Sequence, residues 1–98
     1  MQVGPEDVIA EVARQYKVSR EEIFRRRRGR ENEAGKVAMY LVRRCCDWTL
    51  TETAKYFGTG SYAAVSWSCR MVEARMAKDK KMRTRIENIT ARNNQLQT

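Results

Sequence analysis

The chain has 98 residues, and its 20 lysines and arginines against 12 aspartates and glutamates give a formal net charge of +8. Hydrophobic residues make up 42% of the sequence and charged residues 33%, which is typical of a folded globular domain and excludes a disordered chain. We expect one domain over residues 1–98. A domain this basic favours a polyanionic partner, and nucleic acid is the first polyanion to consider.

The composition also excludes several kinds of functional site. There is no histidine, so zinc sites of the Cys/His kinds, Ser-His-Asp catalysis and acid–base catalysis by histidine are excluded. The sequence contains neither the run of about 18 to 20 apolar residues that a membrane span requires nor a signal peptide at its start. Three cysteines, two of them adjacent, argue against a disulfide framework. We therefore expect a cytoplasmic protein without metal, cofactor or small-molecule substrate, and not an enzyme.

The first part of the sequence predicts two helices. Pro5 suits the first turn of a helix, and apolar residues recur from there at helical spacing as far as Tyr16. Ser19 and Glu22 then have the spacing of a capping box, in which the two residues satisfy each other's backbone N–H groups. This pattern predicts a second, short helix that ends near residue 24 or 25.

A run of arginines separates these helices from a longer third one. Residues 25–30 contain five arginines and Gly29 but no apolar residue, which is typical of a loop. Apolar residues return at helical spacing from about Asn32, and the predicted buried stripe consists of Val37, Ala38, Leu41, Val42 and Cys45. The polar side of this helix carries Lys36, Arg43 and Arg44.

Three further helices are predicted after residue 48. Thr49 and Glu52 form a second capping box and begin a short helix, which the turn Gly58-Thr59-Gly60 ends. Ser61 caps a fifth helix, whose buried stripe is Val65, Cys69, Val72 and Met76. A sixth helix contains Met82, Ile86 and Ile89, and a polar tail follows from Arg92 to Thr98. No strand alternation is present, so the predicted fold is all-α with about six helices.

The fourth and fifth helices have the outline of a helix-turn-helix, over about residues 50–77. In such a motif the first helix braces the second, whose N-terminal residues enter the major groove of DNA. An ordinary helical corner has the same outline, but the charge favours DNA binding. Lys36 and Arg43 are two turns apart on one helix face and could follow a phosphate backbone. The arginine loop could reach a minor groove, or could simply keep the domain in solution.

The segment from Arg25 to about Glu73 resembles the C-terminal DNA-binding domain of the bacterial replication initiator DnaA, and residues 9–24 resemble the start of that domain. The resemblance implies a Trp-repressor-like fold and sequence-specific binding of double-stranded DNA, as in the origin-binding domain of an initiator. The matching residues are Lys36-Val37-Ala38-Met39-Tyr40-Leu41-Val42, Trp48-Thr49-Leu50-Thr51-Glu52, Tyr56-Phe57-Gly58, Val65, Cys69 and Arg70.

The resemblance implies roles for several basic residues. In that family an arginine of the basic loop enters the minor groove, and its place here is Arg27; Arg30 is a further candidate in the same loop. A basic residue that touches phosphate falls on Arg43, and a neighbouring polar contact falls on Lys36. The family's adjacent arginine is absent, because that place is Gly35.

The start of the recognition helix departs from the family. The family signature reads Gly-Gly-Arg-Asp-His-Thr-Thr-Val, whereas this sequence has Gly58-Thr59-Gly60-Ser61-Tyr62-Ala63-Ala64-Val65. Asp, His and Thr side chains can hydrogen-bond base edges, but two alanines offer only apolar contact. Ser61, Tyr62, Ala63 and Ala64 are the candidate base-reading residues, and we expect them to recognise the DnaA box poorly.

The sequence has no ATP-binding Gly-x-x-x-x-Gly-Lys-Ser/Thr loop, such as a complete initiator carries. The kind of protein to which the domain belongs is therefore left open. The domain could belong to a longer initiator with other domains, or it could be a DnaA-like module of a transposase-related or regulatory protein with a different target site. A basic protein-interaction module is a further alternative. RNA binding is disfavoured, because the narrow major groove of A-form RNA does not admit a helix.

Several side chains invite other interpretations. Cys45 and Cys69 lie on apolar stripes, so we expect core positions rather than metal or redox sites. Trp48 precedes a capping box and is predicted to pack over the corner between the third and fourth helices. Trp67 lies off the buried stripe and could face DNA, another domain or solvent. The lysines of residues 78–81 are predicted to be a solvated helix start, with weak non-specific DNA contact as the alternative.

Overall fold

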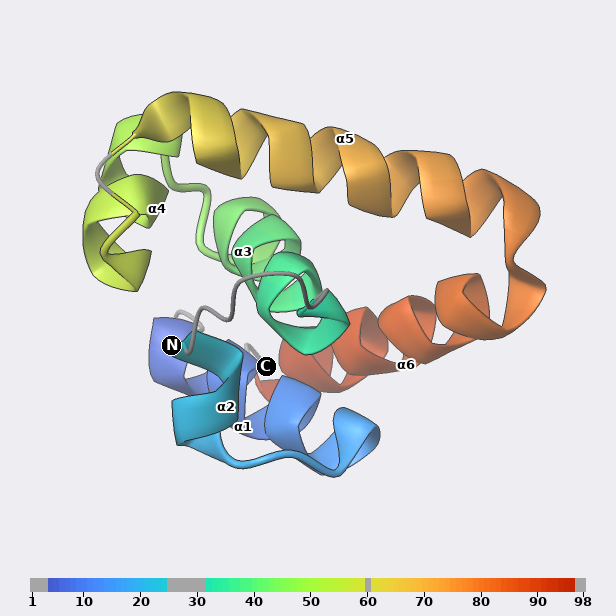
Figure 1. The fold of residues 1–98 in the computed structure, drawn as a ribbon. Coiled ribbons are helices and arrows are strands. Elements are labelled where there is room, and N and C mark those ends of the chain that lie inside the picture. The colour runs from blue at the N-terminus through green and yellow to red at the C-terminus, as the bar shows by residue number, and fades with distance from the viewer. Residues whose placement is uncertain (1–3, 25–31, 60, 97–98) are drawn as a thin grey trace.

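The computed structural model describes residues 4–24, 32–59 and 61–96, which form six helices and no strand (Figure 1). The predicted all-α fold is therefore confirmed. The helices are α1 (Pro5–Tyr16), α2 (Arg20–Phe24), α3 (Glu33–Cys45), α4 (Leu50–Phe57), α5 (Tyr62–Lys78) and α6 (Lys80–Leu96). None of the described helices is long and apolar enough to cross a membrane.

Local capping interactions explain where several of these helices begin. The capping box predicted at Thr49 is present, since Thr49 Oγ1 accepts from the Glu52 N–H and Glu52 Oε1 accepts from the Thr49 N–H, both at 3.1 Å. Ser19 Oγ accepts from the Glu22 N–H at 3.2 Å before α2. Asp79 accepts from the Met82 N–H at 3.1 Å and caps α6. The lysines on either side of Asp79 are exposed, as predicted for a solvated helix start.

Helix α3 forms the centre of the core. It lies between α5 on one side and α1 and α6 on the other, and it contacts all five other helices (Figure 1). Its predicted stripe is buried, except that Cys45 is only partly buried. Because α3 is held from both sides, the basic residues on its remaining face have a fixed position relative to α5. The fully buried residues of this stripe are Val37, Ala38, Leu41 and Val42.

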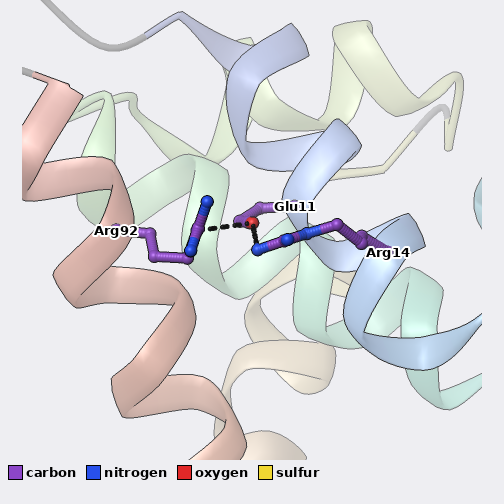
Figure 2. A network of polar contacts seen from close by, with 3 residues as sticks. All are labelled: Glu11, Arg14 and Arg92. Atoms are coloured by element: carbon purple, nitrogen blue, oxygen red, sulfur yellow. Dashed lines mark hydrogen bonds and ion pairs between the residues drawn. The ribbon is translucent and has the colours of Figure 1, made fainter.

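Helix α6 is longer than the sequence indicated. The predicted polar tail from Arg92 is wrong as far as Leu96, because the helix continues to that residue. No proline or glycine interrupts the sequence after Lys80. Arg92 also pairs with the buried carboxylate of Glu11 on α1, with 3.0 Å between Arg92 Nε and Glu11 Oε1, and Arg14 pairs with the same carboxylate (Figure 2). The pair of Arg92 with Glu11 holds the last turns of α6 against α1, whereas the pair of Arg14 with Glu11 lies within α1.

An aromatic cluster fixes the corner between α3 and α4. Trp48 packs edge-on against Tyr56 with 5.4 Å between ring centroids, and Tyr56 packs in the same way against Phe57. Phe24 at the end of α2 stacks on Phe57 with 5.1 Å between centroids. The predicted position of Trp48 is therefore confirmed. The cluster anchors α4 to α2 through Phe24 and to the segment between α3 and α4 through Trp48.

The cysteines are free and belong to the packing of the helices. Cys69 is buried, and Cys45 and Cys46 are partly buried. Burial raises the pKa of all three thiols, so they stay protonated and poorly reactive near neutral pH. In the described ranges, no three Cys, Asp or Glu residues are grouped so that they could hold a metal ion.

Candidate nucleic-acid interface

Helices α4 and α5 form the predicted helix-turn-helix. Helix α4 ends at Gly58, which has a left-handed backbone with φ of 67° and donates its N–H to the Lys55 carbonyl at 3.2 Å. The next residue, Thr59, donates to the Ala54 carbonyl at 3.0 Å. The chain therefore reverses within a short turn, and α4 packs against α5. Gly60, the second glycine of the predicted turn, lies outside the described residues.

The start of α5 presents the predicted base-reading residues to solvent. Ser61 caps the helix, because its Oγ accepts from the Ala63 N–H at 3.2 Å. Ser61, Ala63 and Ala64 are exposed and Tyr62 is 63% exposed, whereas Val65 is fully buried against the core. The four candidate residues thus lie together at the end of the helix that a helix-turn-helix inserts into the major groove.

Two basic residues of α3 lie beside α5. The Nζ atom of Lys36 is 4.8 Å from the ring centroid of Trp67 on α5. Arg43 is exposed and lies next to Cys69 of α5, where its hydrogen bond and charge partly oppose the rise in the thiol pKa caused by burial. The structure therefore brings Lys36 and Arg43 to the same side of the molecule as α5, as their shared helix face predicted.

Arg44 has different surroundings from Arg43. Its guanidinium donates to the Tyr40 hydroxyl at 2.8 Å and lies 5.5 Å from the centroid of the same ring. Together with Tyr40 it lines a groove that Met76 and Ile86 border on the side of α5 and α6. Arg44 therefore lies toward α6, and a role for it as a further phosphate contact beside Lys36 and Arg43 stays a prediction.

The arginine loop, residues 25–30, lies wholly outside the described residues. Arg27 and Arg30 lie outside the described residues, so their predicted roles stay predictions. After the loop, Asn32 caps α3 by accepting from the Gly35 N–H at 2.9 Å. The Nδ2 atom of Asn32 donates back to the carbonyl of Ile23 at 3.0 Å and to that of Glu22 at 3.1 Å. These contacts hold the end of α2 beside the start of α3.

Gly35 has a role that the family resemblance did not indicate. It is buried, and a Cβ atom added to it would lie 2.5 Å from Asn32 Nδ2 and 2.7 Å from the Ile23 carbonyl oxygen. Only glycine allows the start of α3 to approach α2 this closely. Glycine at this place, where the family resemblance implies an arginine, therefore meets a packing requirement between α2 and α3 that spacing along one helix does not reveal.

Trp67 is the site residue whose position the sequence left open. It is 54% exposed, and its ring is covered on one face by Lys36. The signal available in the sequence was its place outside the buried stripe, one turn after Ala63 and Ala64. The contact with Lys36 joins two helices, and helical spacing alone cannot reveal it.

Comparison with known proteins is consistent with this architecture. A family model described as "Bacterial dnaA protein helix-turn-helix" matches residues 5–72. The chain is 36% identical over 77 residues to the chromosomal replication initiator protein DnaA of Aquifex aeolicus, covering 78% of this chain and 19% of that protein. It is 31% identical over 85 residues to the chromosomal replication initiator protein DnaA of Bacteroides fragilis, and the match covers 86% of this chain and 18% of that protein. The chain thus spans about a fifth of the length of these relatives.

Proposed function

Because this chain belongs to the family of bacterial DnaA helix-turn-helix domains, we propose that it binds double-stranded DNA in a sequence-specific way. The observation that carries the proposal is the exposed start of α5 with Lys36 and Arg43 beside it. A net charge of +8 adds a long-range attraction to a polyanion. The role resembles that of the origin-binding domain of an initiator, and the domain itself carries no catalysis. Such a role requires the cytoplasm, where the protein would associate with the nucleoid.

Within this proposal the residues divide into two groups. Lys36 and Arg43 hold phosphates of the backbone, and Arg27 and Arg30 of the loop reach the minor groove. Ser61, Tyr62, Ala63 and Ala64 lie against base edges in the major groove. Phosphate contacts position the domain on any duplex, whereas base contacts set the preference between sequences.

The target site is proposed to differ from the DnaA box. All four candidate reading residues differ from the family signature, and two of them have lost every side-chain hydrogen-bonding group. The changed reading residues favour a DnaA-like module of a transposase-related or regulatory protein as the second candidate. Both candidates share the same DNA-binding surface, and they differ in the sequence that this surface selects.

Replacing Tyr62 with alanine should change which sequences are preferred while leaving binding to random duplexes nearly unaltered. The side chain is 63% exposed and lies at a base-reading position, so its removal costs little stability. Competition binding measures the ratio of the affinity for a selected site to the affinity for random duplexes. We expect this ratio to change by about tenfold. The conservative Tyr62→Phe variant separates the hydroxyl from the ring. A uniform loss on both kinds of duplex would contradict a base-reading role for Tyr62.

A further inference from the structure

The exposed face of α5 continues beyond the four residues assigned above to base reading. Trp67 follows Ala63 by four positions and Ala64 by three, so the three side chains lie on one face of the helix. All three are exposed. Within the described ranges, Tyr62 and Trp67 are the large hydrophobic side chains that solvent reaches most. The first two turns of α5 therefore present an apolar surface.

Cations from two helices border this apolar surface. Lys36 of α3 covers one face of the Trp67 ring at 4.8 Å from its centroid, a contact that restricts the orientation of the indole. Arg70 of α5 is exposed one turn further along and donates to Ser66 Oγ at 3.3 Å. An apolar partner would have to dehydrate these charges, whereas a polyanion pairs with them. The surroundings of Trp67 therefore fit DNA better than an apolar protein surface.

We propose that Trp67 contacts DNA in the major groove and, with Ala63 and Ala64, selects sites that present thymine there. The inference rests on the proposed function and names the chemistry that this surface reads. Thymine shows a C5-methyl group and the O4 acceptor in the major groove. The indole offers an apolar ring and one N–H donor, and the alanines offer only methyl groups. Cytosine, in contrast, presents a donor that none of these three side chains can accept.

The test compares thymine with uracil, which differs only in lacking the C5-methyl group. A random-sequence selection with the full chain first yields a bound duplex, which is then synthesised again with uracil in place of thymine at one position at a time. At positions read by this surface, we expect binding to weaken about fourfold for each methyl group removed. The Trp67→Ala variant should bind the thymine duplex about tenfold more weakly and lose the discrimination at the position it reads.

The other tryptophan, Trp48, provides a matched control for the Trp67 variants. Trp48→Phe changes a tryptophan that packs against Tyr56 in the aromatic cluster, and it should keep the full discrimination between thymine and uracil. In this variant Trp67 is the remaining tryptophan, because the sequence contains two. Its fluorescence should become protected from acrylamide quenching when the selected duplex is added. Trp67→Phe keeps an apolar ring and serves if the alanine variant does not fold.

The outcomes distinguish the inference from the function on which it rests. Loss of discrimination in Trp67→Ala, or its reduction in Trp67→Phe, with protection of the Trp67 fluorescence in Trp48→Phe, supports the inference. Equal binding of thymine and uracil duplexes overturns it while leaving DNA binding intact, as does unchanged discrimination in both Trp67 variants. Failure to bind any duplex overturns the proposed function as well.

Discussion

Replacing Gly35 with alanine should lower the free energy of unfolding by about 2 to 4 kcal/mol, although alanine is the better helix former. The added Cβ would lie 2.7 Å from the Ile23 carbonyl oxygen, a backbone atom that cannot move without shifting the end of α2. It would also displace Asn32, which caps α3 and bonds to Ile23 and Glu22. Loss of a cap costs about 1 kcal/mol and each broken hydrogen bond about as much.

Urea denaturation followed by circular dichroism measures this change. Gly4→Ala is the matched control, because the added Cβ there would meet its nearest neighbour, Asp7 Oδ2, at an ordinary distance of 3.7 Å. Gly4 is the N-cap of α1, where alanine is less favourable than glycine, so we expect that variant to lose no more than about 1 kcal/mol. A Gly35→Ala variant as stable as the control would mean that α2 and α3 are not packed as described.

The same close approach bears on the arginine that the family resemblance implies at residue 35. Any side chain at residue 35 would meet the Ile23 carbonyl oxygen, so a substitution to arginine would disturb the packing of α2 against α3. Among the described residues, Lys36 and Arg43 are the ones proposed to bind phosphate. Their combined removal is the second change with a large expected effect.

The double variant Lys36→Gln, Arg43→Gln should bind every duplex about 10 to 100 times more weakly. Both residues lie beside α5, and each is proposed to displace counterions from one phosphate. The plot of log affinity against log salt concentration should become less steep by about 1.8, or about 0.9 for each phosphate that is no longer neutralised. Fluorescence anisotropy titrations at several salt concentrations measure both quantities.

A second double variant separates local contacts from total charge. Lys78→Gln, Lys81→Gln removes the same two charges from exposed positions at the corner of α5 and α6. We expect it to weaken binding only slightly and to leave the salt dependence almost unchanged. If the two double variants weakened binding equally, long-range attraction alone would account for binding, and the proposed phosphate contacts would be wrong.

Features governed by neighbouring residues could be predicted from the sequence. The box of Thr49 and Glu52, the cap at Ser61 and the turn at Gly58 depend on residues a few positions apart. The helical stripe of α3 was also predictable, because burial follows the period of the helix. The end of α6 was missed, because the partner that holds Arg92 is Glu11, far away in sequence.

The same limit explains which parts of the candidate site were missed. The reading residues follow from the helix-turn-helix outline and the family resemblance, and Lys36 and Arg43 from their spacing. The contact of Lys36 with Trp67 depends on how α3 crosses α5. The need for glycine at residue 35 depends on the approach of α2. Neither relation leaves a pattern along one helix, so only the packed structure shows it.

The most direct test of the proposed function is an anisotropy titration of the chain against two labelled duplexes, one with a DnaA box and one with its bases shuffled, at two salt concentrations. We expect comparable binding to both duplexes that weakens steeply with salt, because the phosphate contacts are retained and the reading residues have changed. Clear preference for the box would contradict the proposal that the changed residues at the start of α5 select a different site. Absence of binding to either duplex at low salt would contradict the DNA-binding function itself.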